Sequence, residues 1–211
     1  MSDHPEFARW SRIYAGDEYY YVHEPGPVAR RAVRYARPLQ ASDAPVTGGR
    51  ALDAGCGEGQ DLAFLAAQGY AATGIEWTPD GARKTHRLLQ SRALHAEVIE
   101  GDLRDLGGLD TATQYDLVLS VNALQFMGRD APACLELLMR RTSPGGVIGL
   151  SLFAREDGAP QMSGTIFHFT LDELLARFAA WQPLEAARLW QWNTAGEAQA
   201  FVTLIARKVR Q

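Results

Sequence analysis

Short apolar runs alternate with segments of helix-like apolar spacing along the chain from about residue 50 onward. The runs at 50–54 and 115–121 are almost continuous, which is typical of strands covered by helices on both faces. After the first run, Leu62 and Leu65 recur at helical spacing until Gly69 ends that helix. This alternation predicts a doubly wound α/β sheet that binds its ligand at the carboxyl ends of the strands.

The other predicted strands are apolar or β-branched segments bounded by turn residues. They cover 70–75, 95–99, 147–153, 184–192 and 200–208. We expect the last two to pair as a hairpin across the loop at 194–197. The Ser-Pro-Gly-Gly segment at 143–146 is predicted to be the turn that begins the fifth strand.

The predicted helices are marked by their first residues. Thr78 is an N-cap followed by Pro79 at the first helical position, and Thr170 with Glu173 has the pattern of a capping box. Another helix is predicted near 131–141. In the helix that begins at Pro79, the basic side chains are expected to point outward. These are Arg83, Lys84 and Arg87.

Residues 1–49 have no strand pattern, and we expect them to form an N-terminal helical lid or appendage on a domain formed by residues 50–211. A helix over 25–37 would end at Pro38, and 41–49 reads as a polar link. Six aromatic residues would either cover a bound ligand or dock this appendage on the sheet. They are Phe7, Trp10, Tyr14, Tyr19, Tyr20 and Tyr21.

Charge and cysteine content narrow the class of partner. Lys and Arg number 21 against 25 Asp and Glu, a net charge of −4 without basic blocks, so no nucleic acid is expected. No apolar stretch has the roughly 20 residues of a membrane span, which favours a cytoplasmic protein without membrane contact. Cys56 and Cys134 are too far apart to suggest a metal cluster, and no metal is expected. A small molecule is the predicted partner.

A glycine loop at 53–59 follows the first strand and opens the next helix. Counted from Gly55, a dinucleotide fingerprint needs glycine at the first, third and sixth positions, but the sixth is Gln60. The loop therefore departs from the dinucleotide pattern, while Gly57 and Gly59 still allow a ligand to approach the backbone closely.

The charges around this loop favour a cationic ligand. Residues 51–73 contain no Lys or Arg, whereas Asp53, Glu58 and Asp61 lie in or beside the loop. A pyrophosphate would meet like charges there. S-Adenosylmethionine, with an ammonium, a sulfonium and no phosphate, would meet opposite charges. The alternative is a tight strand-to-helix turn in which the acids are incidental.

Two more acidic residues follow successive predicted strands. Glu76 lies 21 residues beyond Gly55, near the roughly 20-residue offset at which an acid reaches ribose hydroxyls. Asp102 follows the third strand, where its carboxylate would accept a hydrogen bond from an adenine amino group, with Trp77 or Leu103 packed on the ring. A turn-capping acid is the alternative for Asp102.

These segments resemble the motifs of the class I S-adenosylmethionine-dependent methyltransferases. The similar segments are 52–59, 74–76, 101–103, 115–120 and 143–146. Within that superfamily, 124–127 and 167–170 look most like the tellurite-resistance and related small-substrate methyltransferases. The resemblance implies S-adenosylmethionine as cofactor and a seven-stranded mixed sheet in the order 3-2-1-4-5-7-6, with strand seven antiparallel.

The reaction so implied is in-line methyl transfer to a small-molecule acceptor with an oxygen, nitrogen, sulfur or chalcogen nucleophile. The candidate catalytic residues are His168, Tyr21 and Asn122, with Gln125 and Trp192 as further acceptor-pocket candidates. The candidate cofactor-binding residues are Trp10, Tyr14, Asp53, Gly55, Cys56, Gly57, Gly59, Asp61, Glu76, Trp77, Asp102, Leu103 and Asn122.

Several alternatives stay open. His168 could instead be a buried, hydrogen-bonded structural residue. A noncatalytic module that binds S-adenosylmethionine or adenosine has the same sequence signature, because methyl transfer has no obligatory catalytic residue. A nucleotide-dependent oxidoreductase is a third reading, and the acidic loop argues against it. The oligomeric state is expected to be a monomer or a homodimer.

Overall fold

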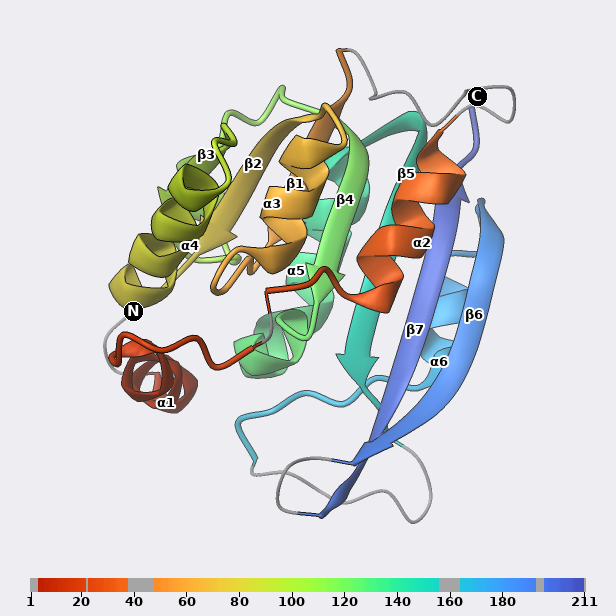
Figure 1. Ribbon diagram of the computed structural model, residues 1–211. Coiled ribbons are helices and arrows are strands. Elements are labelled where there is room, and N and C mark those ends of the chain that lie inside the picture. Colours follow the sequence, from red (N-terminus) through yellow and green to blue (C-terminus); the bar gives the residue numbers. More distant parts are fainter. Residues whose placement is uncertain (1–3, 22, 38–47, 156–163, 193–195, 211) are drawn as a thin grey trace.

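A seven-stranded sheet in the order β3-β2-β1-β4-β5-β7-β6 forms the centre of the molecule (Figure 1). The computed structural model describes residues 4–21, 23–37, 48–155, 164–192 and 196–210, and of Trp192 the backbone alone. The strands are β1 (Arg50–Ala54), β2 (Ala71–Glu76), β3 (Glu97–Glu100), β4 (Tyr115–Val121), β5 (Thr142–Phe153), β6 (Trp181–Trp192) and β7 (Ala198–Lys208).

Strand direction matches the sequence prediction. β7 runs antiparallel to both β5 and β6, and the other neighbouring pairs are parallel. The predicted fold class, strand order and hairpin of β6 with β7 are confirmed. The fifth strand begins earlier than predicted, because residues 143–146 lie inside β5 instead of forming a turn before it. The β4–β5 register shifts there, between the pairs Tyr115–Thr142 and Leu117–Val147.

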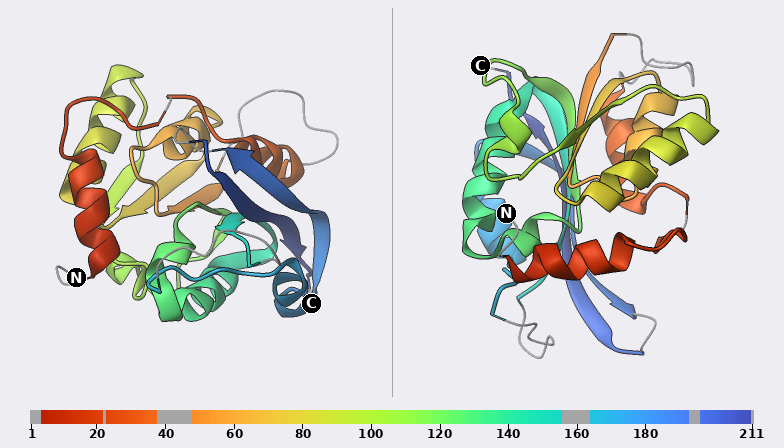
Figure 2. Two further views of the ribbon diagram at one scale, coloured as in Figure 1. Left: turned by 90° about the horizontal axis from the view of Figure 1, so that it is seen from below. Right: turned by 90° about the vertical axis from the view of Figure 1, so that its left-hand side faces the viewer.

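Helices cover both faces of the sheet, with α2, α3 and α4 on one face and α5 and α6 on the other (Figure 2). Short 3-10 helices, η1 and η2, follow β3 and β4. The bounds are α1 (Pro5–Tyr14), α2 (Pro27–Ala36), α3 (Gln60–Ala67), α4 (Pro79–Ser91), η1 (Leu106–Gly108), η2 (Leu124–Asp130), α5 (Ala131–Arg141) and α6 (Leu171–Arg177).

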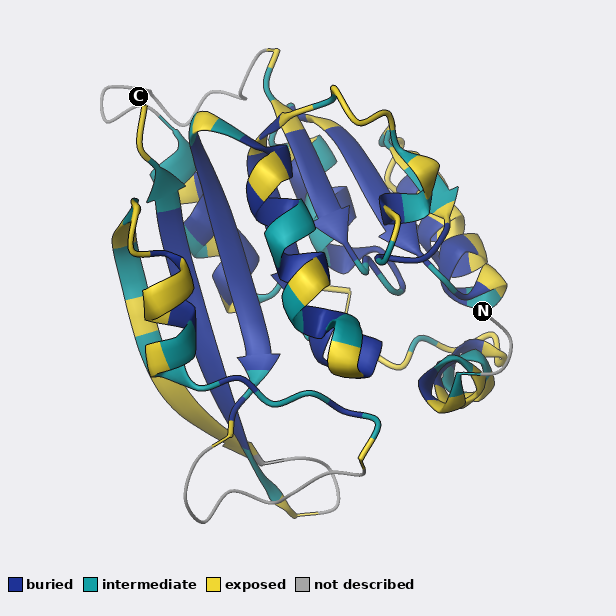
Figure 3. Cartoon of the chain, turned by 180° about the vertical axis from the view of Figure 1, so that it is seen from behind, coloured by how far each residue is buried: buried dark blue, intermediate teal, exposed yellow. Residues whose placement is uncertain are grey.

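The core lies in two buried apolar clusters, one on each face of the sheet. Leu52, Val118 and Ile148 belong to the cluster beneath α5 and α6, and Leu117 and Leu119 belong to the other cluster. Neighbouring strand residues point to opposite faces, so β4 contributes to both clusters. The central strands are accordingly buried, whereas the edge strand β6 is largely exposed (Figure 3).

Helix α1 lies across the end of the sheet at which the parallel strands finish (Figures 1 and 2). The sequence predicts a helical lid or appendage over residues 1–49 but gives no bounds for a helix at 5–14. The side chain of His4 caps the first turn by accepting a hydrogen bond from the Glu6 amide, and Trp10 and Tyr14, four positions apart, form its buried face. This helix therefore carries two of the aromatic candidates to the carboxyl ends of the strands.

Helix α2 packs on the sheet as part of a helix layer, because Val28, Ala29, Ala32 and Val33 are buried against β4 and β5. The division into 1–49 and 50–211 stays a prediction. No helix in the described parts of the chain has the length and apolar content that a membrane span needs. The cytoplasmic location stays a prediction.

One prediction about α4 is wrong. Arg83 and Arg87 do point outward and form ion pairs with the exposed Asp17. Lys84 is fully buried instead of exposed, and its ammonium lies 2.9 Å from the buried carboxylate of Glu58. Helical spacing alone placed Lys84 with its basic neighbours, because the partner that draws it inward lies 26 residues away in the sequence.

Candidate functional site

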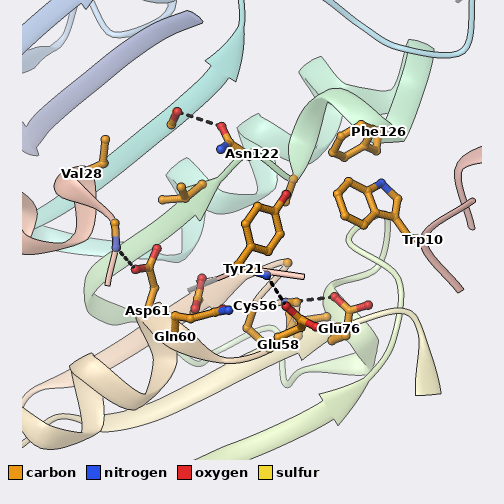
Figure 4. Close-up of a pocket in the computed structure, with 18 of the residues that line it drawn as sticks. Trp10, Tyr21, Val28, Cys56, Glu58, Gln60, Asp61, Glu76, Asn122 and Phe126 are labelled. Carbon is orange, nitrogen blue, oxygen red and sulfur yellow. Dashed lines mark hydrogen bonds between the residues drawn. The ribbon is translucent and has the colours of Figure 1, made fainter. Parts of the chain in front are cut away.

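A cavity of about 490 Å³ opens at the carboxyl ends of the parallel strands, where a doubly wound sheet binds its ligand (Figure 4). The glycine loop and the ends of β2 and β4 form one side of it. Helix α1, the segment around Tyr21 and the start of α2 form another. The cavity therefore joins segments from the first 31 residues to the centre of the sheet.

The glycine loop has a backbone shape that other residues would disturb. Gly55 has φ +86°, and a Cβ built there would lie 2.2 Å from the Cβ of Ala123. Gly57 has φ +57°, and its Cβ would lie 3.0 Å from the hydroxyl of Tyr14. The amides of Gly55 and Cys56 both donate to the carbonyl of Ile75, which fixes the loop to β2. Glycine is thus required by both conformation and space.

Two carboxyl groups lie close together on the loop side of the cavity, that of the buried Asp53 and that of the half-buried Asp61. Burial raises the pKa of Asp53 well above its usual value, and the charges of Asp61 and Glu76 raise it further. Burial also raises the pKa of Asp61, against the hydrogen bond that its carboxylate accepts from the Gly26 amide. Asp53 Oδ2 is buried without a hydrogen-bond partner among the described residues. A cationic ligand group would relieve this arrangement.

Glu76 ends β2 with its carboxylate inside the cavity. Oε1 accepts from the Thr78 amide at 2.9 Å and from its hydroxyl, and Oε2 accepts from the Gly57 amide at 3.1 Å. Burial nevertheless raises its pKa to about 7, since those hydrogen bonds only partly offset the loss of water. Oε2 keeps capacity for a further donor such as a hydroxyl.

Glu58 has a basic partner that the sequence pattern does not predict. The acids of the loop were expected to lack basic partners, and for Glu58 this is wrong because Lys84 forms a buried ion pair with it. The excess of acid at the cavity therefore comes from Asp53, Asp61 and Glu76, which line it together.

The aromatic wall of the cavity comprises Trp10, Tyr21 and Phe126 (Figure 4), with Tyr14 between Trp10 and the glycine loop. The ring of Trp10 lies 5.3 Å from Tyr14, 5.1 Å from Phe126 and 6.4 Å from Tyr21, centroid to centroid. Tyr14 is buried, and burial followed by the charge of Glu76 raises its pKa well above the usual value. Its hydroxyl consequently keeps its proton near neutral pH.

Asn122 follows β4 in a backbone conformation that is uncommon outside glycine, with φ +56°. Its backbone amide donates to the backbone carbonyl of Ser151 at 2.8 Å, and its side-chain Oδ1 accepts from the Ser151 hydroxyl at 2.9 Å. Oδ1 accepts one hydrogen bond from Ser151, so Asn122 can offer a ligand in the cavity the donors of Nδ2 and the second lone pair of Oδ1.

Most of the predicted cofactor-binding residues meet in this cavity. They are Trp10, Tyr14, Asp53, Gly55, Cys56, Gly57, Asp61, Glu76, Trp77, Leu103 and Asn122. Tyr21, from the catalytic candidates, lines it as well and is partly exposed at its mouth.

The other predicted residues lie outside the described lining of the cavity. Gly59 packs against Thr85 at the start of α3. Asp102 is engaged by Arg104, through the amide at 2.9 Å and the guanidinium at 2.7 Å, as the turn-capping alternative predicts. Gln125 is fully buried beside the cavity, and the side chain of Trp192 lies outside the described residues.

His168 also lies outside that lining. Its ring is stacked on Phe153 with centroids 6.2 Å apart, and Phe153 contacts Phe126 of the aromatic wall. Burial lowers the pKa of His168, and its buried Nε2 has no hydrogen-bond partner within the described part of the chain. Two rings, Phe153 and Phe126, thus lie between the imidazole and the cavity.

Several residues that line the cavity were not predicted from the sequence. Gln60, directly after the glycine loop, has a buried Nε2 that is unpaired among the described residues. The only feature of the sequence that could have pointed to Gln60 is its place directly after the glycine loop. Arg31 of α2, which is paired with Glu185 at 2.6 Å, and Thr203 of β7 also line the cavity. They come together only through strand order and helix docking, which local patterns do not specify.

Comparison with known proteins agrees with this geometry. Residues 51–146 match the family described as "Methyltransferase domain". The chain is 24% identical over 166 residues to the "Probable S-adenosyl-L-methionine-dependent methyltransferase TehB" of Haemophilus influenzae strain 10810. That alignment covers 75% of this chain and 57% of TehB, so the chain spans little more than half the length of this curated relative.

Solved structures share the fold. The crystal structure of TehB from Haemophilus influenzae superposes with a TM-score of 0.71 at 20% identity, covering 96% of this chain and 67% of that one. The N-methyltransferase NodS from Bradyrhizobium japonicum WM9, in complex with S-adenosyl-L-homocysteine, gives 0.68 at 18% identity, covering 96% and 97%. The chain therefore has the fold of the class I methyltransferases, whose cofactor is S-adenosylmethionine, and its residues 51–146 match the methyltransferase-domain family, in agreement with the sequence resemblance.

Proposed function

We propose that this chain transfers a methyl group from S-adenosylmethionine to a small-molecule acceptor. The observation that carries the proposal is that one cavity joins the acidic glycine loop to an aromatic wall and the Asn122 amide. Donor and acceptor would share this space, and its volume of about 490 Å³ lies within the range of small-molecule sites. When bound, S-adenosylmethionine would supply the electrophilic methyl group.

The unpaired groups near the loop fit the amino-acid end of the donor. Asp53 Oδ2 is a buried acceptor and Gln60 Nε2 a buried donor, each without a partner among the described residues. An ammonium would satisfy Asp53 and a carboxylate would satisfy Gln60. Asp61 would add to the attraction for the ammonium, because its carboxyl lies close enough to raise the pKa of Asp53.

The nucleoside end of the donor fits the ends of β2 and β3. Glu76 would accept hydrogen bonds from ribose hydroxyls, and Gly55 and Gly57 would let the donor approach the backbone. Leu103 and Trp77, on the cavity wall, would pack on the adenine ring. Asp102 would contribute by holding the turn that carries Leu103.

The acceptor would lie against the aromatic wall. Tyr21 and Trp10 would exclude water from the reacting atoms, and Asn122 would orient the acceptor through its Nδ2 group. Methyl transfer in line needs alignment above all, so these residues would act by positioning. His168 would support the wall from behind, through Phe153.

Incubation with methyl-labelled S-adenosylmethionine and a panel of thiols, amines, phenols and chalcogen oxyanions tests the proposal. We expect label in one class of acceptor, together with release of S-adenosylhomocysteine. Tight donor binding without transfer across the panel would overturn methyl transfer and favour the noncatalytic module. The same samples, run on a sizing column, test the predicted monomer or homodimer.

A further inference from the structure

A buried ion pair joins the glycine loop to helix α4. The side chains of Glu58, in the loop, and Lys84, on α4, have no exposed surface, and Lys84 Nζ lies 2.9 Å from Glu58 Oε1. Taking two charges out of water is costly, and such a pair often stabilises a fold no more than apolar residues of the same volume would. Stability alone therefore does not account for the pair, and the other groups that Glu58 and Lys84 bond have to be considered.

The carboxylate of Glu58 holds two consecutive backbone amides from another part of the chain. Oε1 accepts from the amide of Tyr20 at 2.9 Å, and Oε2 accepts from the amide of Tyr21 at 3.0 Å. These two amides are 37 and 38 residues away in sequence. Hydrogen bonds to an ionised acceptor are roughly twice as strong as neutral ones, so the charge on Glu58 matters to the attachment.

Lys84 bonds the two residues that precede Tyr20, which are Glu18 and Tyr19. Its ammonium donates to the carbonyl of Glu18, and its own carbonyl accepts from the hydroxyl of Tyr19 at 2.9 Å. The ring of Tyr19 also lies 5.6 Å from the ammonium, within cation–π range. Residues 18–21, which we name the strap, are thus tied at every position to Glu58 or Lys84.

The strap ends at the ring that closes the cavity. The Tyr21 ring projects into the cavity between Asn122 and the glycine loop, while its amide is bonded to Glu58 (Figure 4). Gly57, next to Glu58, donates to Glu76 and accepts from the Thr85 hydroxyl, so the same loop faces the proposed donor. The donor loop and the acceptor wall are therefore joined through one buried carboxylate.

We propose that Glu58 and Lys84 are positioning residues that set the place of the Tyr21 ring on the acceptor wall. The inference rests on the proposed function for its role in catalysis. Glu58 supplies the charge that two strap amides require, and Lys84 supplies the counter-charge that allows a carboxylate to stay ionised without water. Neither residue needs to touch the acceptor.

Removing both charges tests this proposal better than removing one, since a single change leaves the other charge buried and unpaired. The variant is Glu58→Gln with Lys84→Met. We expect hydrogen exchange of the Tyr20 and Tyr21 amides to rise by about 100-fold in the ligand-free protein, as their charged acceptor is lost. Exchange in β4 should stay unchanged.

The ring itself can be followed by ¹⁹F NMR of 3-fluorotyrosine placed at position 21. The neutral pair should shift or broaden this resonance, whereas the same label at Tyr70, buried at the end of β2 away from the cavity, should not respond. Calorimetry should find the affinity for S-adenosylhomocysteine changed by less than about threefold. A merely structural role would lower the melting temperature and leave the Tyr21 resonance in place.

Two results would overturn the inference. One is that hydrogen exchange of the strap amides and the ¹⁹F resonance at position 21 both stay unchanged. The other is a fold-loss of S-adenosylhomocysteine affinity as large as the fold-rise in exchange of the strap amides. If the Met variant does not fold, Glu58→Gln with Lys84→Gln keeps one acceptor and one donor and should raise exchange by about tenfold. If the wild-type protein fails to bind S-adenosylhomocysteine, the proposed function falls, while the ligand-free measurements still decide the inference.

Discussion

The two ends of the cavity are built in different ways. The donor end comes from short contiguous segments at strand ends, and its shape is set by backbone, as Gly55 and Gly57 show with positive φ angles and close neighbours. The acceptor end comes from α1, the strap, α2 and β4–β7, and its shape is set by packed side chains such as Trp10 on Phe126. Substitutions should therefore separate the two ends.

Gly55→Ala should give the largest effect, confined to the donor end. The new methyl group would lie 2.2 Å from Ala123 Cβ on a residue with φ +86°, so the loop must move. We expect affinity for S-adenosylhomocysteine to fall by more than about 100-fold in calorimetry. Gly108→Ala, also at positive φ (+75°) but with no atom within 4 Å, is the matched control. An equal loss in both would show that backbone strain, not the close approach, matters.

Glu76→Gln should weaken the same binding by roughly 30-fold, since hydrogen bonds to a charged acceptor are lost. Glu100→Gln, at the neighbouring position of β3 and exposed, should leave binding unchanged. Unchanged binding in Glu76→Gln would remove the ribose assignment and leave the donor end without its best-placed acid.

The pH dependence of binding sharpens the same assignment. The pKa of Glu76 is raised from 4.5 to about 7, so this group stabilises the ligand-free fold at low pH, and that contribution is lost as pH rises through about 7. Because ribose hydroxyls would favour the ionised form, affinity for S-adenosylhomocysteine should rise by about tenfold from pH 6 to pH 8, with proton release below pH 7. Calorimetry in buffers of different ionisation enthalpy measures both, and Glu76→Gln should flatten the curve. A falling affinity would contradict the assignment.

Asn122→Gly tests the acceptor end. Glycine keeps the positive φ and removes the amide, so we expect kcat/KM for the acceptor found in the panel to fall by about tenfold. Affinity for S-adenosylhomocysteine should change by less than about threefold. If donor affinity fell as much as acceptor turnover, the two ends would not be separable at this residue.

His168→Gln should have the smallest effect. The imidazole lies behind Phe153, outside the described lining of the cavity, so we expect kcat to change by less than about threefold. A pH–rate profile that loses a limb in this variant would instead identify His168 as the proton acceptor.

Much of the donor end could be predicted from sequence because its residues lie in short contiguous segments at strand ends. Glycines, acids and strand ends fall at fixed spacings, and eight of the 11 predicted cofactor-binding residues that line the cavity belong to this end. The strand order came from the family resemblance, and the structure agrees with it.

Contacts at both ends of the cavity resisted prediction for a physical reason. The burial of Lys84 depends on Glu58, and the buried Nε2 of Gln60 depends on helix α3 facing the cavity. Thr203 and Ser151 share a face only because β5 and β7 pair in one register. Such contacts are decided by tertiary packing, which no segment encodes by itself.

Titration of the wild-type protein with S-adenosylhomocysteine in a calorimeter tests the donor site most directly. We predict one site per chain with a Kd on the order of micromolar, and no detectable heat with NADH under the same conditions. Absence of binding by a folded sample, or tighter binding of NADH, would contradict the assignment of this cavity to S-adenosylmethionine.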